Sequence, residues 1–188
     1  CPYHAWSFEI ESGNCTNVDK HLLIGNKKSC TSLKSIKVDT VGNFIFLLFS
    51  NNSDLTLKEY LGDVFQDLLI ATDILDFSSG STQNINHKCN WKHIVENVID
   101  NKHCSVVHQK TLADMGFCEN KPITTIHGFH NDFIIYPDEN KNKFSKKKKK
   151  LLNLIYRGKE IVDYYKHILI FPNLTISVFE GVHYTVGF

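Results

Sequence analysis

The sequence predicts an α+β fold in which helices pack against an antiparallel sheet. Segments with helical spacing of apolar residues are interspersed with short runs typical of strands, and several such runs follow one another late in the chain. The 188 residues, 42% of them hydrophobic, are enough to bury a core. This length fits one globular unit with a smaller remnant.

The first half of the chain is expected to contain strands followed by helices. Its aromatic-rich first dozen residues predict a tight loop that leads into a short strand. Two further strands are expected at 35–39 and 43–49, around a turn at Gly42. Apolar positions with helical spacing then predict one or two amphipathic helices over 56–77, interrupted near Gly62.

In the second half, strands and helices are expected to alternate before the chain ends in several strands. The expected elements are a strand at 81–89, a helix that opens at Trp91 under an Asn90 cap, strands at 123–129 and 132–136, a helix over 151–167, and strands at 168–171, 175–179 and 183–186. The lysine run Lys146–Lys150 is expected to be a solvated loop before the later helix. Docking of an acidic electron-transfer partner is its functional alternative.

Composition argues against several classes of protein. The formal net charge is +1, so we expect no nucleic-acid partner. The longest apolar run, Phe44–Phe49, is far shorter than the roughly 20 residues of a membrane-spanning helix, so we expect no membrane partner. The six cysteines and the N-x-Ser/Thr patterns leave open a secreted, disulfide-bonded binding module.

A concentration of ionisable groups follows Trp91. Asp100 and His103 are three apart and share a helix face. His103 and His108 are five apart, about 140° round an ideal helix, so both reach one metal only where the helix breaks or bulges. Two imidazoles and one carboxylate are the ligand set of non-haem Fe(II) sites. Ordinary polar histidines are the alternative.

A second ligand pair lies at the start of the chain. Cys1 and His4 form a C-x-x-H pair in a loop that contains proline. A thiolate and an imidazole at this spacing suit zinc or one edge of an iron–sulfur cluster, but they are half a site. Chance occurrence is the alternative.

Together these segments resemble the Rieske non-haem iron oxygenases. CPYHAW at 1–6 is similar to the second half of the Rieske signature, and NWKHIVENVIDNKHCSVVH at 90–108 resembles the mononuclear iron motif. Between and after them, the segments at 38–63 and 167–179 are similar to further stretches of the family, in the same order.

The resemblance implies a catalytic α subunit fragment, truncated at both ends. Residues 1–50 would be the C-terminal edge of a Rieske 2Fe-2S domain, and 51–188 part of a helix-grip catalytic domain. Cys1 and His4 would each hold one iron of the cluster. His103 and His108 would hold the Fe(II), and the third ligand, a carboxylate, would lie beyond residue 188.

The acidic residue of the motif has its own implied role. Asp100 would bridge His103 and the cluster histidine of a neighbouring subunit, and Asn97 would stand near the iron. One departure is Lys102, which stands before His103 where the family usually has tyrosine and so leaves the local packing open.

The resemblance also implies the reaction and its partners. Electrons would pass from NAD(P)H through a reductase, with or without a ferredoxin, to the cluster and then to Fe(II), where O2 is activated and inserted into a small organic substrate. The protein would be a cytoplasmic homotrimer, with or without β subunits, and this fragment alone would be inactive.

Two choices stay open at this point. Aromatic substrates are favoured, but the sequence from Glu96 to Cys104 also resembles that of family members that oxidise quaternary amines such as choline or carnitine derivatives. A helix-grip ligand carrier without a redox role is the rival in which His103 and His108 are ordinary polar residues.

Overall fold

A computed structural model describes residues 2–3, 5–18, 32–50, 53–74, 81–138, 140, 145–156, 161–180 and 183–187. The chain divides into two compact units, one formed by 1–40 and 45–54 and the other by 41–44 and 55–188. The predicted division into a Rieske remnant at 1–50 and a catalytic portion at 51–188 concerns function and stays a prediction. Within the described ranges, no helix is long and apolar enough to cross a membrane.

The first unit contains short antiparallel pairs. Strand β1 (Ser7–Phe8) pairs with β2 (Cys15–Asn17). Strands β3 (Lys37–Val41) and β4 (Phe44–Leu48) form the predicted hairpin, and their turn belongs to the second unit. Gly42 in this turn has a φ of +55° and lies against Thr72, where a Cβ would overlap the threonine side chain.

Two helices open the second unit, as the sequence predicts. Helix α1 (Leu57–Leu61) begins at a capping box in which Thr56 and Glu59 bond each other's backbone N–H groups. It ends at Gly62, whose φ of +54° turns the chain into α2 (Val64–Ile74). The apolar stripe of this pair, formed by Leu61, Val64 and Leu68, is fully buried.

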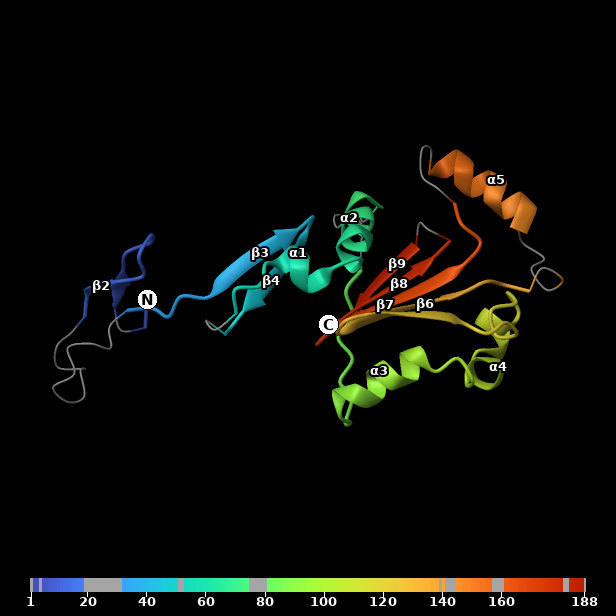
Figure 1. Cartoon of the computed structure of the whole chain (residues 1–188), viewed down its shortest axis with the longest axis horizontal. Helices are drawn as coiled ribbons and strands as arrows, with labels where there is room; N and C mark the ends of the chain where they lie inside the picture. Colours follow the sequence, from blue (N-terminus) through green and yellow to red (C-terminus); the bar gives the residue numbers. More distant parts are fainter. Residues whose placement is uncertain are drawn as a thin grey trace. The chain divides into compact units, whose positions relative to one another are not determined.

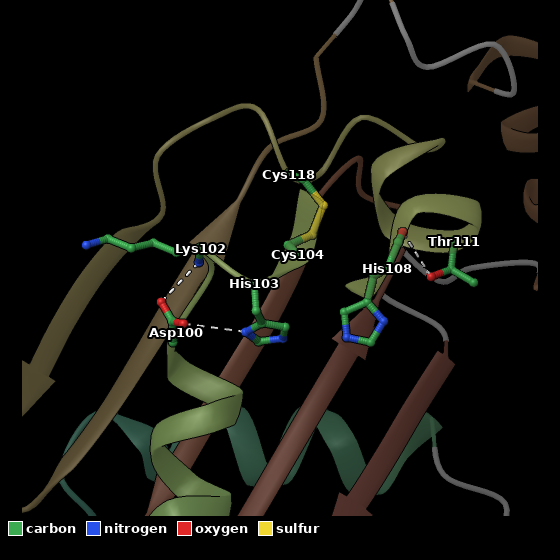
Figure 2. The surroundings of a disulfide bond; sticks show 7 residues. All are labelled: Asp100, Lys102, His103, Cys104, His108, Thr111 and Cys118. Carbon is green, nitrogen blue, oxygen red and sulfur yellow. Dashed lines mark hydrogen bonds and ion pairs between the residues drawn. A yellow bond between two sulfur atoms is a disulfide. The ribbon is translucent and has the colours of Figure 1, made fainter. Parts of the chain in front are cut away.

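A five-stranded antiparallel sheet forms the centre of the second unit. Its strands follow one another in chain order, each paired with the next: β5 (Ile123–His127), β6 (His130–Ile135), β7 (Tyr165–Ile170), β8 (Leu174–Phe179) and β9 (His183–Gly187). In both views α3 (Trp91–Ile99) and α4 (Cys104–Val107) lie on one side of the sheet and α2 on the other (Figures 1 and 2). The predicted α+β class with an antiparallel sheet is therefore correct, whereas the helix-grip and Rieske-edge assignments stay predictions.

Alternation along the strands gives the two faces of the sheet different chemistry. On the α2 side, Lys166 of β7 donates to both carboxylate oxygens of Asp67, at 2.8 and 2.9 Å. On the other side, Phe133, Tyr165 and Phe179 pack with Phe117, which follows the helical segment after α4. The aromatic face is thus the one turned toward the candidate metal ligands.

Three sequence predictions are wrong. Residues 81–87 form no strand and are exposed, since no neighbouring strand pairs with them among the described residues. The predicted helix over 151–167 is instead the end of α5 (Ser145–Ile155) and, after residues that are not described, the start of β7. The lysine run lies inside α5 rather than in a loop, because lysine is a good helix former.

Candidate metal centre

Helix α3 leads the chain to the candidate ligands. Asn90 caps it by accepting a hydrogen bond from the backbone N–H of Lys92 at 3.1 Å, which confirms the predicted start. The helix ends at Ile99, and Asp100 adopts an extended conformation as its C-cap. The regular helix therefore ends before His103, so Asp100 and His103 do not share a helix face as the sequence predicts.

Asp100 and His103 nevertheless remain neighbours. Asp100 Oδ1 accepts a hydrogen bond from the backbone N–H of Lys102 at 3.0 Å, and Oδ2 lies 3.6 Å from His103 Nδ1 (Figure 2). The Lys102 N–H is the main reason that the pKa of Asp100 lies below its usual value, and His103 adds to it. Because Lys102 acts here through its backbone and its side chain is exposed, replacing the usual tyrosine leaves this contact intact.

The two histidines come together because the chain is irregular between and after them. His103 is the N-cap of the single turn α4, and His108 lies between this turn and a π-helical segment, Gln109–Ala113. Their rings lie 5.4 Å apart between centroids, in a T-shaped arrangement (Figure 2). The break that the spacing required is therefore present.

This separation suits two ligands of one ion. Two imidazole nitrogens that each lie about 2.1 Å from a metal place their ring centroids roughly 5 Å apart. No third histidine, cysteine or carboxylate completes a metal-binding group within the described part of the chain. The donor set present thus fits two of the three ligands of a facial triad, and the third is expected from elsewhere.

A disulfide next to the first histidine was not predicted. Cys104, expected to be only a small buried residue, is indeed buried but bonds to Cys118 (Figure 2). The bond joins α4 to the turn that carries Phe117. The 14-residue separation of the two cysteines carries no recognisable motif, so the sequence held no signal for this pair.

The histidines border a cavity of about 150 Å³. Asp100 and Asn97 line it from α3 and its end, and the sheet side is lined by Phe133, Ile135 and Tyr165. Asn97 thus lies at the same cavity as His103 and His108. The sequence does not reveal these apolar wall residues, because strand alternation alone does not say which face meets the cavity.

The candidate ligand pair at the start of the chain cannot be placed. Cys1 and His4 lie outside the described residues, so the predicted half-site for an iron–sulfur cluster stays a prediction.

Comparison with known proteins decides the family. The family model described as "Ring hydroxylating alpha subunit (catalytic domain)" matches residues 74–187. The chain belongs to this family. The matched range contains α3, both histidines and the whole five-stranded sheet, so the family resemblance predicted from the sequence is confirmed for the ring hydroxylating alpha subunits.

Individual members of the ring hydroxylating family are distant relatives. The carnitine monooxygenase oxygenase subunit of Acinetobacter pittii is 26% identical over 114 residues, which cover 57% of this chain and 29% of that protein. The glycine betaine monooxygenase oxygenase subunit of Chromohalobacter salexigens is 24% identical, with 61% and 25% covered. The anthranilate 1,2-dioxygenase large subunit of Acinetobacter baylyi is 30% identical, with 60% and 25% covered.

A solved structure shares the fold. The quaternary ammonium Rieske monooxygenase CntA, in complex with an inhibitor, matches with a TM-score of 0.67 at 20% identity, over 99% of this chain and 47% of that chain. The chain thus spans about half of that structure, and its matched part spans less than a third of these curated relatives.

Proposed function

We propose that the chain is part of the oxygenase α subunit of a Rieske non-haem iron enzyme, with His103 and His108 as two ligands of Fe(II). The observation that carries the proposal is the approach of the two rings, 5.4 Å apart, at the cavity of a ring hydroxylating alpha subunit fold. Bound iron would supply the activation of O2, which the side chains present do not provide.

The chain's own residues have three tasks in this proposal. His103 and His108 hold the ion, and Asp100, 3.6 Å from His103 Nδ1, accepts from this imidazole and fixes its tautomer and orientation. Asp100 is half-exposed, so it stays open to the histidine of a neighbouring subunit that the family resemblance implies. The apolar wall limits the access of water to the site.

The remaining parts of the enzyme are also proposals. Cys1 and His4 would hold the two irons of a 2Fe-2S cluster together with ligands from outside this chain. The cluster would receive electrons from NAD(P)H through a reductase, with or without a ferredoxin. A homotrimer, with or without β subunits, would bring one subunit's cluster to the next subunit's Asp100.

For the substrate we favour a quaternary amine over the aromatic compound that the sequence resemblance favours. Three aromatic side chains, Phe117, Phe133 and Tyr165, line the cavity together with the ionised Asp100. Aromatic faces and a carboxylate are the groups that attract a cation without hydrogen bonds. Two of the relatives are named for carnitine and glycine betaine, which both carry a quaternary nitrogen.

An aromatic substrate is the second candidate. The same aromatic walls suit ring stacking, and one relative is named for anthranilate. Both candidates place an apolar or cationic group against the sheet, so charge is the property that distinguishes them.

The test of the iron site uses the complete reading frame, expressed anaerobically with iron. We expect EPR of the reduced protein to report the Rieske cluster, and metal analysis to report one further iron per subunit beyond the two of the cluster. The changes His103→Ala and His108→Ala should each abolish the further iron and spare the cluster signal, because a facial triad needs both imidazoles.

The matched control is His93→Ala, since this side chain is 71% exposed on α3 and lies outside the cavity. It should retain all of the iron. If the histidine variants keep the mononuclear iron, or a folded wild type never binds it, the oxygenase proposal is wrong and the ligand carrier becomes the better explanation.

A further inference from the structure

Three polar side chains form a hydrogen-bonded chain on the cavity side of the sheet. The Tyr165 hydroxyl donates to Ser177 Oγ at 3.1 Å, and Ser177 Oγ lies 2.8 Å from His167 Nδ1. The strand register explains the arrangement, because His167 is directly opposite Ser177 and Tyr165 is two residues before His167 on the same face. Tyr165 also lines the cavity beside His103 and His108.

His167, at the inner end of this hydrogen-bonded chain, is held in place and uncharged. His167 is only 2% exposed and stacks on Phe133, with ring centroids 5.4 Å apart. Burial lowers its pKa from 6.5 to about 4. The imidazole is therefore neutral at physiological pH and has no freedom to move away from Ser177.

Counting donors shows what Tyr165 has left for a ligand. The phenol has one proton, which it donates to Ser177. When the serine hydroxyl donates to His167 Nδ1, its oxygen can only accept from the phenol, so the direction of the bond is fixed. In this tautomer, with the His167 proton on Nε2, Tyr165 offers a ligand only its ring and the lone pairs of its oxygen.

We propose that Tyr165 is a specificity-determining residue that selects a cationic head group, and that Ser177 and His167 are positioning residues that hold its proton away from the ligand. This inference rests on the proposed quaternary-amine function and goes beyond it by assigning the selection to a polar chain. A phenol whose proton faced the cavity would repel a cation and donate to an anion.

The test compares two ligands that differ only in charge. Choline is the cation, and its neutral isostere has a quaternary carbon in place of the nitrogen. Binding of each is measured by calorimetry on the complete, iron-free protein, so the result does not depend on turnover. We expect the wild type to bind choline about tenfold more tightly than the isostere, as aromatic recognition of a cation predicts.

Ser177 provides a matched pair of variants. Ser177→Thr keeps the hydroxyl, and Ser177→Val puts a methyl group in its place within the same shape. The Thr variant should keep the tenfold preference. The Val variant should lose most of it, roughly fivefold, because the phenol proton has no acceptor and turns to the cavity.

Tyr165→Phe keeps the proposal testable if Ser177→Val does not fold. It should weaken choline binding several-fold and leave binding of the isostere unchanged. Equal preference in the Thr and Val variants, or unchanged choline binding in the Phe variant, would overturn the inference alone. A wild type that shows no preference for the cation would overturn the substrate proposal and this inference together.

Discussion

The imidazole of His167 lies between Phe133 and Ser177, almost out of contact with water. Its pKa of about 4 in the folded protein is lower than the 6.5 of an exposed histidine, so the unfolded chain binds more protons between these values. Stability from this group is therefore fully present above pH 6.5 and is lost as the pH falls toward 4.

We expect the wild type to lose about 2 kcal/mol of unfolding free energy from this residue between pH 7.5 and pH 5. Urea titrations at the two pH values measure the loss, and His167→Gln should remove this part of the pH dependence because glutamine does not titrate. His93→Gln is the control, since His93 is exposed. A pH dependence of His167→Gln that matches the wild type would show that His167 is not neutralised by burial.

At the same scale, the residues differ in how far the sequence revealed them. His103, His108 and Asp100 belong to a motif, so the sequence placed them together, and the structure brings them to one cavity. Tyr165 and Ser177 belong to no motif. Their roles follow from strand register and from which sheet face meets α3, and neither property is local in sequence.

Among the elements, α4 is the one on which the site depends most. It is a single turn, too short to be stable by itself, and it holds His103 at one end and His108 at the other. The Cys104–Cys118 bond ties this turn to the segment that carries Phe117. The cross-link therefore holds both candidate ligands and one aromatic wall residue close together.

Removing this cross-link should destabilise the oxidised protein. For a separation of 14 residues, loop-closure entropy predicts about 3 kcal/mol of stabilisation. We expect Cys118→Ser to lower the free energy of unfolding by roughly 2–3 kcal/mol without reductant, and by much less with a dithiol, which also opens the wild-type bond.

The matched control is Cys89→Ser, because Cys89 is an exposed free cysteine. It should unfold like the wild type under both conditions. Thiol titration under denaturing conditions gives an independent count, since the reductant should expose two additional thiols. If Cys118→Ser matches the wild type without reductant, the bond does not form in solution.

The sequence predicts the wrong element where a short apolar stretch fits both the helical and the strand period. The apolar positions from Ile161 to Tyr165 fit a helical period, yet these residues lead into β7. A short apolar stretch does not distinguish the two periods, and pairing with β6 and β8 decides between them.

The lysine run in α5 makes contacts that the sequence does not reveal. Lys148 Nζ lies 2.7 Å from Glu180 Oε1, and Lys149 Nζ lies 3.3 Å from Asp163 Oδ2. Both carboxylates are distant from the lysines in sequence.

Within the second unit as a whole, the sheet places its buried lysine–carboxylate pairs and its aromatic side chains on opposite faces. On the α2 side, burial lowers the pKa of Lys166, but the carboxylates of Asp67 and Asp132 outweigh it and the pKa is raised. On the cavity side, the buried histidine is neutral and the walls are aromatic. The fixed ion pairs therefore lie away from the cavity, and Asp100, at its edge, supplies the one carboxylate among the described lining residues.

The last prediction concerns the whole chain and its metals. In the proposed enzyme, Cys1 and His4 would be two of the four ligands of a Rieske cluster, and His103 and His108 would be two of the three ligands of Fe(II). Two ligands hold neither group firmly. We therefore expect the 188-residue chain alone, reconstituted anaerobically with iron and sulfide, to show no stable 2Fe-2S spectrum.

Its Fe(II) affinity, measured by chelator competition, should be at least about tenfold weaker than that of the complete reading frame, because loss of a group that supports a metal typically costs 10- to 100-fold. The complete reading frame under identical conditions is the positive control for cluster assembly. A stable cluster in the isolated chain would mean that Cys1 and His4 find other partners, most directly a second copy of the same chain. Wild-type iron affinity in the isolated chain would mean that the third ligand lies within it, and Asp100, as the carboxylate nearest to His103, would then be the first residue to test.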